Sequence, residues 1–180
     1  MTPASSGWPG SALLQASAYR SWLVTPGSLT QRLGEHCDTL TVRRLFQGLQ
    51  RPFHDEAGCV GLTASRYAHV REVLLVADGV PVVFAHSITA PESLRGAWRA
   101  LSRLGERPLT LTLFGDRRVT RGALAFRVLD RRHPLHRRVA ELGLEPPVLL
   151  WARRSQFLRE DCALLVTEVF LPAVLTMRER

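Results

Sequence analysis

Two apolar runs on either side of an Asp-Gly turn restrict the fold of this chain more than any other feature of its sequence. The runs cover residues 67–76 and 81–88, and Ala77-Asp78-Gly79 lies between them. Both runs are rich in residues that favour strands. Asp-Gly is typical of a tight hairpin turn, because both residues adopt the backbone conformation that such turns require. The sequence therefore predicts an antiparallel hairpin, and with it an antiparallel sheet.

Further strands and a few short helices are predicted on both sides of this hairpin. Two strands, 148–157 and 162–170, surround a short turn, and another strand covers 119–129. The segment 39–47 fits either a strand or a helix. Helices are predicted over 11–23, over 29–36 with Ser28 as N-cap, over 91–104 with Thr89 and Glu92 as a capping box, and over 133–142. This order indicates an α+β fold with the helices on one side of the sheet.

The length of 180 residues is that of one domain. The first ten residues are rich in Pro, Gly and Ser, which indicates a disordered lead over 1–10 and a single domain over 11–180. No apolar run approaches the roughly 20 residues that a membrane-spanning helix needs. The lead has no positive region followed by a long apolar run, so no secretory signal is predicted. We expect a monomer in the cytoplasm.

The basic, sulfur-containing and glycine residues exclude several classes of function. All 24 basic residues are arginine, so enzymes that need a Schiff-base lysine or a P-loop lysine are excluded. Cys37, Cys59 and Cys162 show neither disulfide nor zinc spacing. The closest histidines, His133 and His136, are flanked by arginines that repel a metal cation. No GxSxG or GxGxxG motif is present, and we expect neither a metal nor a cofactor.

The net charge of +8 raises the question of nucleic-acid binding. Basic residues cluster at 117–121, 131–133 and 137–138. None of these clusters alternates with aromatic side chains that could stack on bases, and no zinc-finger, RNP or KH signature is present. We interpret the clusters as a solvated surface and expect no nucleic-acid partner. The same positive potential would attract a small dianionic substrate.

Two predicted strands each carry one charge on an otherwise apolar face. Side chains alternate along a strand, which places Arg71 and Glu168 among apolar neighbours on their own strands. A charge on such a face is costly unless it is paired or binds a ligand. The two residues could form a buried ion pair, each could lie in water at a strand end, or both could bind a ligand. Glu72, on the opposite face from Arg71, is interpreted as the partner of a surface arginine.

Four blocks of the sequence resemble, in order and rough spacing, the motifs of the bacterial chorismate pyruvate-lyases. The blocks are REVLLVADG at 71–79, LGERPL at 104–109 followed by LF at 113–114, WARRS at 151–155, and LVTEVFLP at 165–172. The resemblance covers about residues 20–174. The chain departs from compact members of the family between residues 129 and 151, where an insertion over 131–147, including the predicted helix, looks like added length.

The resemblance implies a fold, a reaction and a set of site residues. The fold is a six-stranded antiparallel sheet with helices on one side and helical flaps over an internal ligand cavity. The reaction splits chorismate into 4-hydroxybenzoate and pyruvate without a cofactor, usually for ubiquinone biosynthesis. The arginine and glutamate that contact the aromatic product in the family fall on Arg71 and Glu168, the expected catalytic residues. Two further substrate-binding positions fall on Leu29 and Leu109.

These residues suggest how the reaction could proceed. Arg71 would bind the ring carboxylate through its planar fork, and Glu168 would accept a hydrogen bond from the 4-hydroxyl. The proton acceptor is either Glu168 or the enolpyruvyl methylene. Arg153 and Arg154 are candidates for the second carboxylate, or they belong to a solvated strand end. Slow product release is expected from a closed cavity. The alternative function is a non-catalytic domain of the same fold that senses a small molecule.

Overall fold

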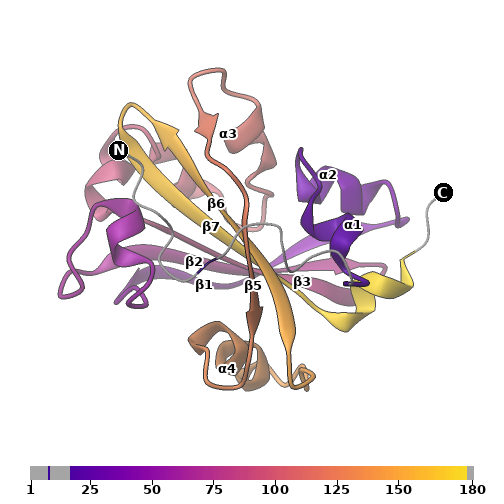
Figure 1. Ribbon diagram of the computed structural model, residues 1–180. Helices are drawn as coiled ribbons and strands as arrows, with labels where there is room; N and C mark the ends of the chain where they lie inside the picture. The colour runs from indigo at the N-terminus through magenta and orange to yellow at the C-terminus, as the bar shows by residue number, and fades with distance from the viewer. Residues whose placement is uncertain (1–7, 9–16, 178–180) are drawn as a thin grey trace.

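The computed structural model describes Trp8 and residues 17–177, and within this part of the chain the core is one antiparallel sheet of seven strands (Figure 1). Their order in the sheet is β1-β2-β3-β7-β6-β4, and β5 also pairs with β6. The strands are β1 (Leu40–Gln50), β2 (Ala68–Ala77), β3 (Val80–Thr89), β4 (Thr120–Arg121), β5 (Ala125–Leu129), β6 (Leu150–Arg159) and β7 (Cys162–Phe170). The α+β class is confirmed.

The helical elements are short. The Ser28 hydroxyl accepts a hydrogen bond from the Gln31 amide, which confirms the predicted N-cap. The helix predicted over 133–142 is also confirmed. Of the helix predicted over 11–23, residues 11–16 lie outside the described part. The α-helices are α1 (Arg20–Leu23), α2 (Leu29–Gly34), α3 (Thr110–Phe114) and α4 (Pro134–Glu141), and the 3-10 helices are η2 (Ala57–Val60), η3 (Pro91–Arg95), η4 (Arg99–Arg103) and η5 (Pro172–Thr176).

Both predicted hairpins are confirmed. β2 and β3 pair around Asp78 and Gly79, whose φ angles are 48° and 82°. β6 and β7 pair around Glu160 and Asp161, with φ angles of 50° and 61°. The Asp78 carboxylate also accepts a hydrogen bond from the Thr39 amide at 2.8 Å. This contact holds the start of β1 against the first hairpin, and the ambiguous segment 39–47 is a strand paired with β2.

The prediction of six strands is wrong, because the strand expected over 119–129 is divided into β4 and β5. Both pair with β6, with Arg121 opposite Phe157 and Ala125 opposite Arg154. Three residues separate Arg121 from Ala125, whereas two separate Phe157 from Arg154, so the edge contains one extra residue. Such an extra residue is a β-bulge, which changes the side chains that face each side of the sheet.

The single helix predicted over 91–104 is also wrong. Two 3-10 helices, η3 and η4, occupy this segment, and Gly96 after η3 has a φ of −130° and a ψ of −112°, outside helical geometry. The expected capping box does not form, because Thr89 still belongs to β3. Its hydroxyl donates to the Ala163 carbonyl at 2.7 Å, and Glu92 forms an ion pair with Arg66.

Helices cover both faces of the sheet, so the prediction that they gather on one side is wrong (Figure 1). The upper face, which carries Val73 and Leu75 of β2, packs against α1 and α2, for example through Leu33. The lower face, which carries Leu74 of β2, packs against α4 through Leu135. Side chains alternate between the two faces along each strand, and helices cover both faces. Both faces of the central strands are therefore buried.

Trp8 is the described residue of the lead predicted over 1–10, and the rest of the lead lies outside the described part. The Trp8 side chain is buried on the lower face, where its Nε1 donates to the Asp55 carboxylate at 2.9 Å. Its ring lies 4.0 Å from the guanidinium carbon of Arg154. Trp8 therefore packs against the folded domain.

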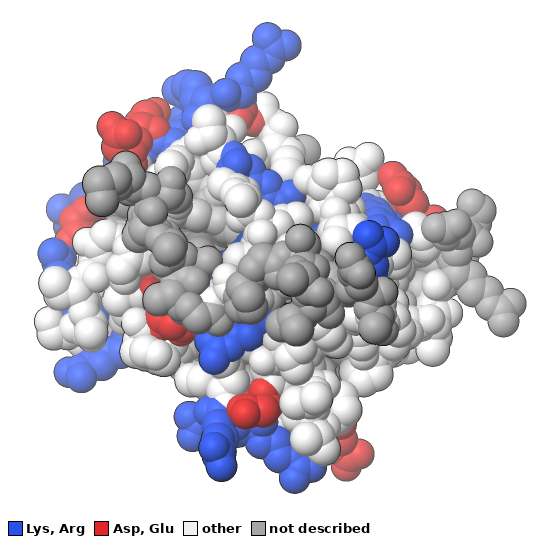
Figure 2. All heavy atoms as spheres, viewed as in Figure 1, with Lys and Arg blue, Asp and Glu red and all other residues white. Residues whose placement is uncertain are grey.

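Arginine side chains are spread over several separate places on the visible surface, with acidic side chains among them (Figure 2). A stripe of positive charge along one groove, as expected for a nucleic-acid track, is not seen in this view. In the described part of the chain, no helix is long and apolar enough to cross a membrane.

Candidate active site

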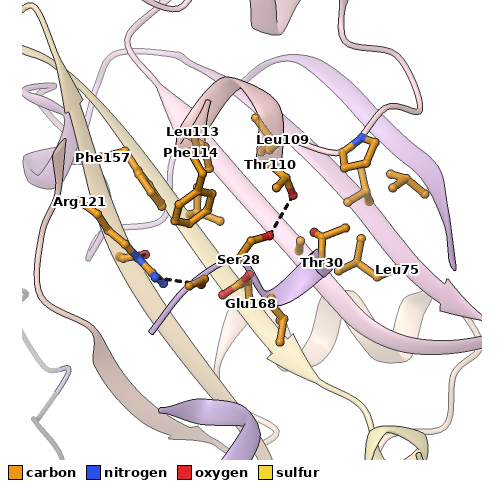
Figure 3. Close-up of a pocket in the computed structure, with 18 of the residues that line it drawn as sticks. Ser28, Thr30, Leu75, Leu109, Thr110, Leu113, Phe114, Arg121, Phe157 and Glu168 are labelled. Atoms are coloured by element: carbon orange, nitrogen blue, oxygen red, sulfur yellow. Dashed lines mark hydrogen bonds between the residues drawn. The ribbon is translucent and has the colours of Figure 1, made fainter. Parts of the chain in front are cut away.

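A pocket lies on the upper face, between the sheet and the segments that begin α2 and α3 (Figure 3). Strands β2, β3, β6 and β7 form its floor, and residues 27–30, 108–110 and 113–114 form two of its walls. The cavity itself measures about 50 Å³, and the space including its open mouth is about 550 Å³. Apolar side chains make up much of the lining, and the charged side chains are those of Arg71, Arg121, Arg153 and Glu168.

The strand register brings Arg71 and Glu168 to this pocket. Arg71 of β2 pairs with Ser87 of β3, and Ser87 pairs with Val166 of β7. Glu168 lies two residues beyond Val166 on the same strand, so it points to the same face. The alternation expected from sequence is confirmed for both residues, and both line the pocket.

Arg71 is a buried cation without a counter-ion. It is 3% exposed, and its Nη2 donates to the carbonyls of Gly105 and Arg107, each at 3.0 Å. Its Nε has no hydrogen-bond partner, and no carboxylate of the described residues lies within ion-pair distance of it. Burial, and to a smaller extent the Arg44 guanidinium, lowers the pKa of Arg71 to about 10. The alternative that Arg71 and Glu168 neutralise each other is therefore wrong.

Glu168 has a different partner, Arg153 on the adjacent strand β6. The two residues are register partners, and the Arg153 Nε donates to the Glu168 Oε2 at 2.5 Å. The Glu168 side chain remains 15% exposed, on the side that faces the pocket. Arg153 Nη1 also donates to the carbonyls of Trp22, Leu23 and Thr25 at 3.0–3.3 Å. Arg153 thus joins Glu168 to the chain around α1.

The other two expected binding positions also line the pocket. Leu29, at the first position of α2, is 2% exposed, and Leu109 precedes α3. The two walls that they belong to are joined by a hydrogen bond of 3.1 Å between the hydroxyls of Ser28 and Thr110. Figure 3 shows this bond across the pocket, with Leu109 on the Thr110 side.

Arg121 is a pocket residue that the sequence interpretation missed. Its Nε donates to the Ser155 hydroxyl at 3.1 Å, and its Nη1 donates to the carbonyls of Pro26 and Gly27 at 2.7 and 3.2 Å. An unbroken strand over 119–129 would place Arg121 on the face opposite Phe126. The bulge between β4 and β5 places both on the upper face, and this irregularity has no clear signal in the sequence.

Arg154, a candidate for the second carboxylate, lies on the opposite side of the sheet from the pocket. It follows Arg153 directly on β6, and neighbouring side chains of a strand point to opposite faces. Its Nη1 lies 3.1 Å from Asp55 Oδ2, its Nη2 lies 3.5 Å from Glu56 Oε1, and its Nε donates to the Thr167 hydroxyl. Arg153 lines the pocket, and Arg154 does not. Neither belongs to a solvated strand end.

Arg154 is part of a buried group of charges that we call the lower-face network. His86 is its centre: its Nδ1 lies 3.2 Å from Glu72 Oε1, and its Nε2 lies 3.4 Å from Glu56 Oε2 without hydrogen-bond geometry. Arg138 of α4 donates to the other oxygen of Glu72 at 2.8 Å. Burial alone would lower the pKa of His86, but the two carboxylates raise it to about 9. The network consists of Asp55, Glu56, Glu72, His86, Arg138 and Arg154.

Glu72 was expected to pair with a surface arginine. Its partner Arg138 is partly exposed, but Glu72 itself is 1% exposed and also contacts His86. Among the described residues, no cluster of three or more His, Cys, Asp or Glu side chains is arranged to hold a metal ion. The functional groups that line the pocket are three arginines, one glutamate, hydroxyls and backbone groups.

Solved structures with a similar fold include the C-terminal domain of PhnF and a GntR-family transcriptional regulator. The C-terminal domain of PhnF aligns with a TM-score of 0.59 at 17% identity, over 81% of this chain and 88% of that domain. A GntR-family transcriptional regulator from Bacillus cereus aligns with a TM-score of 0.51 at 11% identity, over 74% of this chain and 92% of that chain. At these identities the likeness shows a shared fold alone.

Sequence relatives give a narrower result. A probable chorismate pyruvate-lyase of Thiobacillus denitrificans is 46% identical over 173 residues, 94% of this chain and 91% of the relative. A protein of the same name from Aromatoleum aromaticum is 48% identical over 160 residues, 88% of this chain and 86% of the relative. The family model for chorismate lyase matches residues 3–180. By these matches over nearly its full length, this chain belongs to the chorismate lyase family.

Proposed function

We propose that the chain is a chorismate pyruvate-lyase, which converts chorismate into 4-hydroxybenzoate and pyruvate. The observation that carries this proposal is the buried Arg71 cation, which has no counter-ion and lines an apolar pocket beside Glu168. An uncompensated buried charge is costly, so such a site is suited to an anionic ligand. Family membership supplies the identity of that ligand.

Arg71 is proposed to bind the ring carboxylate of chorismate. Its Nη2 is already held by the carbonyls of Gly105 and Arg107, which fixes the plane of the guanidinium. The left-handed backbone at Gly105, with a φ of 59°, turns the chain at this point. The Arg71 Nε has no partner, so the guanidinium keeps unused donor capacity for a carboxylate in the pocket that it lines. A hydrogen bond between two charged groups in a dry site is stronger than one in water.

Glu168 is proposed to accept a hydrogen bond from the 4-hydroxyl of the substrate. Arg153 holds one of its oxygens, which fixes the position of the carboxylate and leaves the other oxygen for the ligand. In the reaction the C3–O bond to the enolpyruvyl group breaks and the hydrogen on C4 leaves, so the ring becomes aromatic. The enolpyruvyl methylene gains one proton and pyruvate forms. Positioning and charge stabilisation are the contributions that this reaction needs from the protein.

The segments of α2 and α3 are proposed to act as flaps over an internal ligand cavity. They meet through the Ser28–Thr110 hydrogen bond, and Leu29 and Leu109 contribute apolar surface beneath them. The contacts of 4-hydroxybenzoate to Arg71 and Glu168 would survive the reaction, so we expect slow release and product inhibition. We place the product in ubiquinone biosynthesis and expect the reaction to need no cofactor.

The proposal is tested by incubating the purified chain with chorismate in the presence of a chelator. We expect equimolar 4-hydroxybenzoate and pyruvate, measured by chromatography and by a coupled lactate dehydrogenase assay. Arg71→Gln and Glu168→Gln should each lower kcat/KM by about 100-fold or more, because each removes a charged contact to the reacting molecule. Arg43→Gln and Glu145→Gln, which alter exposed charges, should retain wild-type turnover. Binding of 4-hydroxybenzoate without turnover of chorismate would instead support the sensing domain.

A further inference from the structure

The charged side chains of the pocket do not balance. Three are arginines and one is a glutamate, which gives the lining a net charge of two positive units. Glu168 neutralises Arg153, with which it forms an ion pair. Arg71 and Arg121 have no carboxylate within ion-pair distance among the described residues, and burial lowers the pKa of each. The pocket is therefore suited to a ligand that carries two separate negative charges.

Arg121 is held in a fixed position by neutral groups. Ser155 accepts from its Nε, and the carbonyls of Pro26 and Gly27 accept from its Nη1. The rings of Phe114 and Phe157 lie 5.7 and 5.5 Å from its guanidinium carbon. No group in the described part of the chain accepts from its Nη2, which leaves that nitrogen available as a donor.

Arg71 and Arg121 reach the pocket from opposite sides. Arg71 lies on β2, and Ser155, which holds Arg121, lies on β6, three strands away in the sheet. Three strand spacings are roughly 14 Å. Glu168, on the intervening strand β7, lies between them. Figure 3 shows the Arg121 side chain reaching towards Glu168 and the segment before α2.

We propose that Arg121 binds the carboxylate of the enolpyruvyl side chain of chorismate. This inference rests on the proposed function, in which Arg71 binds the ring carboxylate. Each of the two uncompensated arginines then meets one of the two carboxylates, and Glu168 faces the 4-hydroxyl between them. The product 4-hydroxybenzoate carries only the ring carboxylate. Arg121 is thus a residue by which the pocket distinguishes substrate from product.

The test compares ligands that have or lack the second carboxylate. The dianionic probe is 3-(1-carboxyvinyloxy)-4-hydroxybenzoate, an aromatic analogue that carries both carboxylates but cannot undergo the elimination. The monoanionic probe is 4-hydroxybenzoate. A lost charged hydrogen bond costs about 1.5–3 kcal/mol, so Arg121→Gln should raise the Kd of the dianion, and the KM of chorismate, roughly 10- to 100-fold. Its Kd for 4-hydroxybenzoate should change by less than about threefold, whereas Arg71→Gln should weaken both probes.

Arg117→Gln is the matched control, because Arg117 is exposed, lies four residues before Arg121 and changes the net charge equally. A second control uses the side-chain methyl ester of the analogue. On wild-type protein the ester should bind as weakly as the dianion binds to Arg121→Gln, and Arg121→Gln should not discriminate between ester and dianion. The ester comparison on wild-type protein does not depend on the folding of a variant.

Two results would overturn the assignment of Arg121. One is equal weakening of dianion and monoanion by Arg121→Gln, which would mean that the residue only holds the segment before α2. The other is a missing contribution of the second carboxylate, seen either as unchanged affinity of Arg121→Gln for the dianion or as equal affinity of the wild-type protein for ester and dianion. Failure of the wild-type chain to convert chorismate is a separate outcome and overturns the proposed function itself.

Discussion

The two faces of strands β2, β3, β6 and β7 differ in whether their buried charges are paired. On the lower face, three carboxylates meet two arginines and a histidine whose pKa is raised to about 9, so every charge has a partner. On the upper face, Arg71 and Arg121 bind only neutral groups. Charges that are all paired within the protein stabilise the folded state. Charges without a counter-ion are instead suited to bind a ligand of opposite charge. Burial alone does not make this distinction, because Arg71 of the upper face is 3% exposed and Arg154 of the lower face is 2% exposed.

The largest expected effect is on stability, from the lower face. Arg154→Met leaves Asp55 and Glu56 buried with one cation fewer, and breaking a buried pair in this way costs about 3–5 kcal/mol. Arg71→Met, on the upper face, loses two hydrogen bonds but also removes an uncompensated charge, and should cost about 1 kcal/mol or less. Urea unfolding of both variants checks this. Equal destabilisation by the two substitutions would contradict the distinction between the faces.

The next effect is a dependence of stability on pH that originates in His86. The pKa of His86 is about 9 in the folded chain, whereas the ordinary value of 6.5 applies to the unfolded chain, where His86 has lost its partners. The folded state therefore binds the proton of His86 more tightly than the unfolded state does. The stabilisation is complete below pH 6.5, declines as the pH rises through this window, and is lost above about pH 9. The loss should be on the order of 1–3 kcal/mol, because each pKa unit corresponds to about 1.4 kcal/mol.

His86→Gln is the matched variant for this measurement, since it keeps a polar side chain and does not titrate. Its free energy of unfolding, measured between pH 6.5 and 9.5, should vary less than that of the wild type. An identical pH dependence in the two proteins would show that other groups, and not the lower-face network, control stability at high pH.

The smallest effect concerns the upper face. Ser28→Ala removes the N-cap of α2 and the hydrogen bond to Thr110 that joins the two walls of the pocket. The loss of a cap costs about 1 kcal/mol. We expect faster release of 4-hydroxybenzoate, seen as a higher inhibition constant and an unchanged or higher kcat. Gln31→Ala, which alters the same helix but keeps its amide and the Ser28 cap, should not change the inhibition constant.

Local sequence patterns were sufficient for the hairpins and for the charged pair of the pocket. The Asp-Gly turn predicted the first hairpin, and the alternation of side chains along each strand predicted the face on which Arg71 and Glu168 lie. Both signals depend only on residues that are close in the sequence. The same alternation implies that Arg153 and Arg154 point to opposite faces, so only one of them can face the ligand. It does not indicate which of the two does. That choice depends on Asp55 and Glu56, which come from a distant loop.

Arg121 shows where local reasoning fails. A single extra residue between β4 and β5 reverses the face on which it lies, and bulges are set by packing across the sheet rather than by a sequence motif. The six-strand prediction failed at the same place. The divided helix at 91–104 has a related cause, since Thr89 remains in β3 and the backbone at Gly96 leaves helical geometry.

The adjacency of Arg153 and Arg154 limits how this chain can vary in length. A one-residue insertion or deletion in β6 before Arg153 would exchange the faces of every later side chain, turning Arg154 towards the pocket and Arg153 towards Asp55 and Glu56. The pocket would then lose the partner of Glu168, and both sets of charges would be disrupted at once. The connection before β6, at residues 142–149, lies outside this constraint. Natural and engineered changes of length should therefore be tolerated there and selected against inside the strand.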